Sequence, residues 1–311
     1  MRREDFYFDS RDGQDKIHAI RWIPDGEIKA ILQVIHGMAE YVARYEGFAE
    51  YMTSKGILVT GEDHLGHGET IAANNGIPGY FCAHDPATVT LRDVHRLKKL
   101  TQETYPQVPY FIMGHSMGSF IVRNYAIRYG KGVQGVIAMG TGMMPNATVK
   151  MAKGMSNFLG IFQGDKHVSK FLEKMSFGSY LSRIPNAKTP VDWLSVNEEN
   201  VKRYIADPLC GFTFTINGFK TLSEFLVRLT DPDAFEMIPK SLPVLFVAGA
   251  EDPVGGWGEQ VKAVAKKYQD AGMQDITLKL YDGDRHEILN EDNKEQVSED
   301  IYQWLSSKLD A

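Results

Sequence analysis

The chain has 311 residues, 43% of them hydrophobic, and a formal net charge of −6 at pH 7. A chain of this size can bury a substantial core, and its negative charge argues against binding to nucleic acid and against electrostatic attraction to anionic lipid. Because no run of about 18 apolar residues occurs and the N-terminus is charged, we expect neither a membrane-spanning helix nor a signal peptide.

Short apolar runs, which predict strands, alternate along the chain with longer amphipathic segments, which predict helices. The strand candidates are 5–9, 16–23, 30–37, 56–63, 109–116, 135–142, 243–250 and 276–283. The helix candidates are about 39–54, 89–104, 117–129, 257–271 and 292–308. From residue 30 onwards the strand candidates are dense in Val, Ile, Leu and Phe, as in parallel strands that are covered on both faces. The pattern predicts an α/β fold with a mostly parallel, eight-stranded sheet and helices on both faces.

The alternation stops between residues 143 and 235, where the sequence has a helical pattern, is rich in Met and Phe, and contains no clear strand. The simplest explanation is an insertion between two strands of the sheet. We therefore expect an α/β core formed by residues 1–142 and 236–311, and a helical cap formed by residues 143–235. The cap would cover the carboxyl edge of the sheet, where open α/β sheets bind their ligands.

The segment Gly114-His115-Ser116-Met117-Gly118 follows a predicted strand and precedes a predicted helix. A G-x-S-x-G sequence in this context is typical of a sharp, strained turn that exposes the serine hydroxyl above the sheet. The pattern alone is weak, because glycine makes up about 7% of residues in an average protein and chance matches are therefore common. The alternative is a glycine-containing loop whose serine caps a helix. The strand and helix on either side favour a nucleophilic Ser116.

A nucleophilic serine needs a base to take its proton. In folds with this kind of serine turn, the acid and then the histidine follow the serine along the chain. His286 is the one histidine beyond the predicted cap, in a loop after the last strand. Asp252 begins the loop after the preceding strand and would orient His286, with Glu251 as the neighbouring alternative. Asp282 and Asp284 are also close to His286 in sequence, but they flank Gly283 and fit a turn.

Two backbone N–H groups should stabilise the oxyanion of the reaction. One would come from Met117, directly after the nucleophile, and the other from the loop after the third strand, at Met38.

These segments together resemble the monoacylglycerol lipase and lysophospholipase group of α/β-hydrolases, which includes serine aminopeptidase-like hydrolases. The family has an HG-x-x-E-x-x-x-RY loop, a D-x-x-GHG loop and a GHSMG turn, and this chain matches them, in order, at the positions His36-Gly37, Glu40, Arg44-Tyr45, Asp63, Gly66-His67-Gly68 and Gly114 to Gly118. The resemblance implies an α/β-hydrolase fold and covers nearly the whole chain. In the D-x-x-GHG loop, Leu65 and Thr70 replace a frequent arginine and serine of the family.

Several further residues are candidates for contact with the substrate. Glu40 and Arg44 are spaced as a surface ion pair, and equally could brace the oxyanion loop or meet the polar part of a substrate. Methionines in and before the cap suit a flexible acyl chain, although any single one is more simply core packing. The predicted contacts are Gly37, Glu40, Arg44, His115, Met143, Met151, Met155 and Trp193, with Met144 and Phe212 as further candidates.

The cluster Asp63, His64 and His67 could suggest a metal site, but a metal needs three or four converging ligands, and a hydrogen-bonded loop is the better interpretation. We expect no metal and no organic cofactor. Cys82 and Cys210 are too few for a disulfide framework and fit a cytoplasmic protein.

The sequence therefore predicts a serine hydrolase of carboxylic esters. The resemblance implies monoacylglycerol or lysophospholipid as the substrate. The alternatives are a short-chain carboxylesterase, a proline-type aminopeptidase that would use acidic cap residues such as Asp192, Glu198 and Glu199, or a hydrolase-like protein that binds without turnover. Transient contact of the cap with a lipid surface is compatible with this prediction, whereas the oligomeric state is left open.

Overall fold

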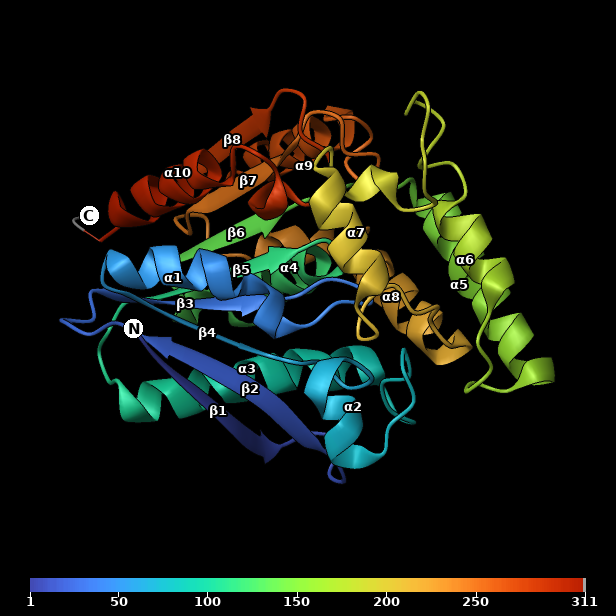
Figure 1. Ribbon diagram of the computed structural model, residues 1–311, viewed down its shortest axis with the longest axis horizontal. Coiled ribbons are helices and arrows are strands. Elements are labelled where there is room, and N and C mark those ends of the chain that lie inside the picture. The colour runs from blue at the N-terminus through green and yellow to red at the C-terminus, as the bar shows by residue number, and fades with distance from the viewer. Residues whose placement is uncertain (310–311) are drawn as a thin grey trace.

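The computed structural model describes residues 1–309 and contains one eight-stranded sheet (Figure 1). Its strand order is β1-β2-β4-β3-β5-β6-β7-β8. The strands are β1 (Arg2–Asp9), β2 (Lys16–Ile23), β3 (Ala30–Ile35), β4 (Ile57–Glu62), β5 (Tyr110–His115), β6 (Gly135–Met139), β7 (Val244–Gly249) and β8 (Ile276–Tyr281). The pairs β1–β2 and β2–β4 are antiparallel, and the remaining neighbours are parallel. The prediction of a mostly parallel α/β sheet is confirmed.

Helices cover both faces of the sheet because the central strands are apolar on both sides. In β5, Tyr110 and Ile112 join a core with α3 (Pro86–Thr104), α4 (Met117–Tyr129) and α9 (Glu259–Asp270). The alternate residues Phe111 and Met113 join a second core with α1 (Glu46–Ser54) and α10 (Lys294–Ser306). Each such fully buried side chain contributes about 1.5–3 kcal/mol to stability. The alternation fixes which side chains of β5 face each helical layer.

The five helices predicted outside the cap are all present, with bounds that differ by a few residues. The first of them, predicted as 39–54, is a short 3₁₀ helix at Val42–Tyr45 followed by α1. A further helix, α2 (Gly68–Asn74), was not predicted. It is too short for a clear hydrophobic period, because an amphipathic pattern needs about three turns to stand out.

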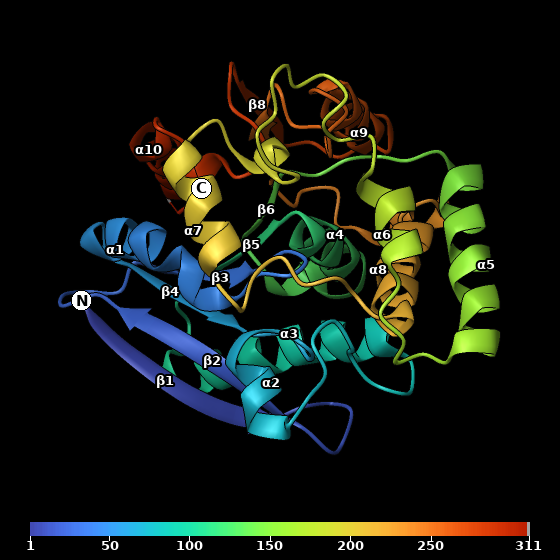
Figure 2. The same ribbon diagram turned by 45° about the vertical axis from the view of Figure 1, so that its right-hand side comes forward.

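Between β6 and β7 the chain forms four helices, α5 (Asn146–Gln163), α6 (Lys170–Phe177), α7 (Glu198–Ala206) and α8 (Ile216–Arg228). In Figure 1, α5, α6 and α8 lie towards the right-hand end of the molecule, opposite both termini, and α7 lies nearer the middle. Figure 2 shows α5 outermost, beside α6 and α8. Helix α5 packs on α8, and α8 packs on α3 and α4. We propose that this segment acts as the cap.

No helix within residues 1–309 is both long enough and apolar enough to cross a membrane.

Candidate active site

Ser116 lies at the sharp turn between β5, which ends at His115, and α4, which begins at Met117. Its backbone has φ 55° and ψ −119°, a combination that a residue with a side chain rarely adopts. The turn is held by hydrogen bonds from the Ser116 N–H to the Met139 carbonyl (3.0 Å) and from the Ser119 N–H to the Ser116 carbonyl (2.8 Å). Backbone strain of this kind persists only where its surroundings enforce it, and it is concentrated at functional sites.

The two glycines of the turn allow three backbone segments to meet. A Cβ atom on Gly114 would lie 2.0 Å from the carbonyl oxygen of Gly118. A Cβ atom on Gly118 would lie 2.1 Å from the carbonyl oxygen of Ile35, at the end of β3. Real Cβ atoms do not approach backbone this closely, so the sequence pattern G-x-S-x-G reflects a packing requirement on both sides of Ser116.

His286 and Asp252 lie together beneath the cap. The Nδ1 atom of His286 is 2.8 Å from Oδ2 of Asp252, and Oδ1 of Asp252 accepts a hydrogen bond of 2.8 Å from the Val254 N–H. Asp252 is 0% exposed. Glu251, the alternative acid, is exposed, and its backbone N–H bonds to the Asp284 carbonyl. The geometry therefore pairs His286 with Asp252.

The other ring nitrogen of His286 is free within the described part of the chain. Its Nε2 atom is buried and has no hydrogen-bond partner among residues 1–309, so the bond to Ser116 Oγ is not made. His286 and Ser116 nevertheless line the same cavity. Catalytic hydrogen bonds are often long without substrate and tighten in the complex.

The predicted oxyanion loop lies directly against Ser116. A Cβ atom on Gly37 would be 3.0 Å from Cβ of Ser116, and the Gly37 N–H donates to Oε1 of Glu40 (2.6 Å). Met117 is the first residue of α4, so its N–H is one of those that a helix leaves without an intrahelical partner. Met38 and Met117 both line the cavity that contains Ser116.

Glu40 forms the ion pair with Arg44 that its spacing predicts, but it is 4% exposed, so the prediction of a surface pair is wrong about its location. In addition to the Gly37 N–H, its carboxylate accepts hydrogen bonds from Tyr45 Oη (3.0 Å), His115 Nδ1 (3.0 Å) and Arg44 Nη1 (2.9 Å). Burial raises the pKa of this carboxyl, but the hydrogen bond and charge of His115 and the charge of Arg44 outweigh burial and hold the pKa of Glu40 well below its usual range. The ionised Glu40 braces the loop that carries Met38.

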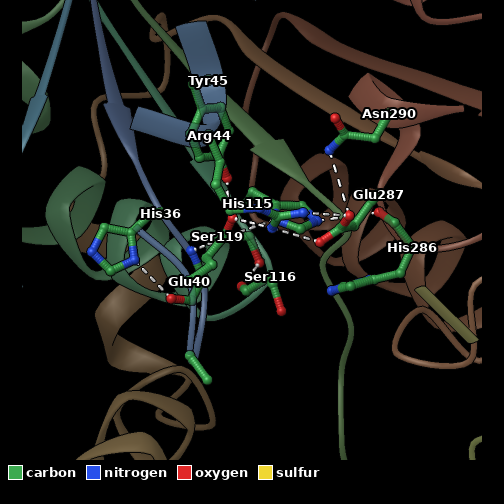
Figure 3. Close-up of polar contacts among 12 residues, drawn as sticks. His36, Glu40, Arg44, Tyr45, His115, Ser116, Ser119, His286, Glu287 and Asn290 are labelled. Atoms are coloured by element: carbon green, nitrogen blue, oxygen red, sulfur yellow. Dashed lines mark hydrogen bonds and ion pairs between the residues drawn. The ribbon is translucent and has the colours of Figure 1, made fainter. Parts of the chain in front are cut away.

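Arg44 connects this loop to the residue after His286 (Figure 3). Its Nη1 and Nη2 atoms donate to the two carboxylate oxygens of Glu287 at 2.8 and 2.9 Å. Glu287 also accepts a hydrogen bond of 2.7 Å from the Asn200 side chain of α7. Glu287 was not predicted as a site residue. The one signal for it in the sequence is that it follows His286 directly.

The loop of His286 is bonded to the segment before α7. Glu291, 1% exposed, accepts hydrogen bonds from Ser195 Oγ (2.6 Å) and from the N–H groups of Val196 and Asn197. It also accepts from the Arg285 N–H (3.0 Å).

Three more hydrogen bonds reinforce the connection between the histidine loop and this segment. Arg285 Nη1 donates to the carbonyls of Asp192 and Ser195, and the Glu287 N–H donates to the Leu194 carbonyl at 2.7 Å. The segment 192–200 therefore supports the histidine loop.

A cavity of about 790 Å³ extends from Ser116 beneath α5, α6 and α8. Its walls are mostly apolar, and they include Phe120, Phe212 and Leu226. Six of the predicted oxyanion donors and substrate contacts line it: Met38, Met117, Glu40, His115, Met151 and Trp193. The ring of Trp193 lies 5.1 Å from the ring of His286. Four other predicted contacts do not line it: Gly37, Arg44, Met143 and Met155.

These four lie outside the cavity for identifiable reasons. Gly37 has no side chain, and Glu40 and Ser116 occupy the space beside its Cα. Arg44 points to Glu287. Met143 and Met155 pack against the core, and it is Met144 that faces the cavity. A sequence rich in methionine does not show which of its members point inward.

A second cavity of about 530 Å³ lies between α1, α7 and α10, and its lining is more polar. Arg44, Arg203, Asp207 and Asn290 contribute to it. Glu40, His115, Tyr204 and Glu287 line both cavities, so the two share a wall next to the candidate catalytic residues.

Asp63 organises the neighbouring D-x-x-GHG loop. Its carboxylate accepts hydrogen bonds from the N–H groups of Val42 (2.8 Å) and Glu69 (3.0 Å), and it lies 2.8 Å from His18 Nδ1. Burial lowers the pKa of His67 to about 3, so this ring is neutral. Within residues 1–309, no group of three His, Cys, Asp or Glu side chains is arranged to hold a metal ion.

The chain is similar in sequence to a known family of hydrolases. Residues 26–293 match the family model described as serine aminopeptidase, S33. The monoacylglycerol lipase of Mycolicibacterium smegmatis is 28% identical over 93% of this chain and 92% of that protein. Human monoglyceride lipase is 27% identical over 92% of this chain and 86% of that protein.

Solved structures of esterases and lipases share the fold of this chain. A thermostable carboxyl esterase from Bacillus coagulans, crystallised in complex with glycerol, is 32% identical and superposes with a TM-score of 0.92 over 99% of both chains. The monoglyceride lipase of Saccharomyces cerevisiae has a TM-score of 0.74 at 20% identity, over 99% of this chain and 95% of that chain, which shows a shared fold.

Proposed function

Because the chain belongs to the serine aminopeptidase S33 family, as an α/β-hydrolase of the monoacylglycerol lipase type, we propose that it cleaves monoacylglycerol or lysophospholipid through an acyl-enzyme on Ser116. The chain is a carboxylic ester hydrolase. The finer proposal is supported above all by one observation, the convergence of Ser116, His286 and the Met38 loop at the end of an apolar cavity.

In the first half of the reaction, Ser116 Oγ attacks the ester carbonyl carbon while His286 Nε2 takes its proton. Asp252 holds the imidazole in orientation and stabilises it once it is charged. The negative oxygen of the tetrahedral intermediate accepts hydrogen bonds from the Met38 and Met117 N–H groups. Losing one such donor typically costs about 3–4 kcal/mol of transition-state stabilisation.

In the second half, the intermediate collapses and the bond to the alcohol oxygen breaks. The alcohol leaves with the proton from His286. A water molecule then attacks the acyl carbonyl, its proton passes to His286, and the carboxylic acid leaves as Ser116 regains its proton. Atoms and charge balance without any further reactant.

The two cavities suggest how an ester with one long apolar part and one polar part would lie. The cavity of about 790 Å³, lined by apolar side chains of α5, α6 and α8, suits an acyl chain. The more polar cavity of about 530 Å³ is separated from it by Glu40, His115, Tyr204 and Glu287, and Ser116 does not line it. The ester bond would therefore lie in the larger cavity, at Ser116, with the polar alcohol next to Glu40 and Glu287. A monoester with a polar head fits this arrangement better than a small, uniformly apolar ester.

The aminopeptidase alternative receives less support. It would need acidic cap groups for the substrate ammonium, but Asp192, Glu198 and Glu199 do not line the cavity of Ser116. Asp192 accepts hydrogen bonds from its own turn, at Lys188 N–H and Thr189 Oγ1.

The test is hydrolysis of a graded series of p-nitrophenyl esters, from acetate to palmitate, together with a monoacylglycerol and a lysophospholipid. Ser116→Ala is the control. We expect activity to rise with chain length and to include monoacylglycerol. Activity on short esters alone would refute the acyl-chain cavity, and cleavage of amino-acid amides in preference to esters would favour the peptidase.

A further inference from the structure

His115 lies beside the nucleophile and takes no part in the reaction as described above. Its ring is 4.6 Å from the ring of His286, and the residue is 5% exposed. Its Nδ1 atom is 3.0 Å from Oε1 of Glu40, and its Nε2 atom is 3.2 Å from the backbone carbonyl oxygen of His286. Figure 3 shows the ring between the two loops that carry these residues.

Both partners of His115 accept hydrogen bonds and cannot donate them. A backbone carbonyl is always an acceptor, and an ionised carboxylate has no proton to give. Glu40 is ionised here because it already accepts from the Gly37 N–H, Tyr45 Oη and Arg44 Nη1. A neutral imidazole has one N–H and one acceptor nitrogen, so it could satisfy only one of the two contacts. The geometry requires a proton on each ring nitrogen.

The charges around His115 lead independently to the same state. The cluster contains two buried carboxylates, Glu40 and Glu287, and one guanidinium, Arg44, whose side chain is 12% exposed. With a neutral His115 the cluster would carry a net charge of −1, and with an imidazolium it is neutral. Uncompensated charge is costly in the interior of a protein. The neutral alternative would therefore be unfavourable both in hydrogen bonding and in charge.

The other titratable groups near the cluster do not change this balance. Burial raises the pKa of Tyr45 and of Tyr204, so both phenols are neutral near pH 7. On the far side of the His286 ring, Asp252 is engaged by His286 itself. The pKa of His115 is raised because the hydrogen bond to Glu40 and the charges of Glu40 and Glu287 together outweigh burial, which lowers it.

We propose that His115 is a permanently protonated imidazolium that ties the oxyanion loop to the loop of His286. One N–H binds Glu40, which holds the Gly37 N–H and hence the position of Met38. The other N–H binds the backbone of His286. His115 is thus a positioning residue, and its kinetic role rests on the proposed function of Ser116 and His286.

The protonation state can be read directly by nuclear magnetic resonance of ¹⁵N-labelled protein. We expect two ring N–H protons on His115 near neutral pH, assigned by their loss in His115→Asn. In Glu287→Gln, which removes a neighbouring charge but neither hydrogen bond of His115, the second proton should be lost at a lower pH. A single ring proton on His115 near neutral pH in the wild type would overturn the proposal, whether or not the protein hydrolyses esters.

Kinetics test the positioning role. In His115→Asn we expect kcat to fall about 10- to 100-fold with little change in KM, because displacements of catalytic groups by about 1 Å have effects of that size. The matched control is His95→Asn on α3, whose ring stacks on Tyr129 and bonds to Tyr125 away from the site, and whose kcat should be that of the wild type. If His115→Asn keeps the wild-type kcat and pH profile, His115 does not position the site.

Discussion

Glu291 provides the sharpest prediction about how the cap segment supports catalysis. Its buried carboxylate holds Ser195, Val196 and Asn197 on one side and the N–H of Arg285 on the other. Because Arg285 precedes His286, we expect Glu291→Gln to loosen the histidine loop from the segment before α7. The change keeps the size of the side chain and removes its charge and one of its acceptor oxygens.

The size of the effect follows from these contacts. If the amide nitrogen takes the place of Oε1, the bond from the Arg285 N–H is lost, while Oε2 keeps Ser195 Oγ at 2.6 Å. A hydrogen bond to a charged group contributes about 1.5–3 kcal/mol, and its unpaired partner adds a similar penalty when buried. The bonds that survive weaken because their acceptor is now neutral. We expect the free energy of unfolding to fall by about 2–4 kcal/mol.

The assay combines urea denaturation with steady-state kinetics on a p-nitrophenyl ester. Alongside lower stability, we expect kcat to fall about tenfold or more, with a smaller change in KM, since His286 is no longer held in position. Glu27→Gln, at an exposed loop position, is the control and should change neither quantity. A Glu291→Gln enzyme with wild-type stability and kcat would refute the reasoning, and lower stability with wild-type kcat would reduce Glu291 to a purely structural role.

Three further predictions concern the core, the turn and the cavity. Burial raises the pKa of Glu62 to about 8, so between about pH 4.5 and 8 this acid is neutral in the folded state and ionised in the unfolded chain. The free energy of unfolding should therefore fall by up to about 1.4 kcal/mol per pH unit over this range. Glu62→Gln should flatten that slope, as measured by urea titrations at several pH values. An unchanged slope would show that Glu62 is ionised in the fold. Gly118→Ala should abolish activity, because its Cβ would meet the Ile35 carbonyl oxygen. The control Gly154→Ala, in open space on α5, should keep activity and raise the melting temperature slightly. An active Gly118→Ala enzyme would contradict the packing of the turn. Ala152→Trp should fill part of the cavity and lower kcat/KM for palmitate far more than for acetate esters, and an equal loss for both would argue against an acyl site there.

The sequence predicted the sheet and the candidate catalytic residues because their signals are local. Apolar runs mark the central strands, and the pattern around Ser116 combines a strand, a turn and a helix within a few residues. The order of Asp252 and His286 after it follows from the strands that precede them. In each case, the position of a residue next to a strand end carries the information.

The buried charge network could not be predicted in the same way. Arg44 and Glu287 are 243 positions apart, and their contact depends on how two loops meet at the sheet edge. The same applies to Glu291 and Ser195. Helical spacing predicted a surface pair for Glu40 and Arg44. The pair forms, but it is not on the surface, because Tyr204 and Glu287 cover Arg44.

The central claim is that Ser116 is an activated nucleophile, and covalent labelling tests it most directly. The protein is incubated with a fluorophosphonate, and the adduct is located by mass spectrometry of the digested chain. The account predicts a single adduct on Ser116, absent from Ser116→Ala and formed far more slowly in Asp252→Asn. Folded wild-type protein that remains unlabelled at Ser116 would contradict it.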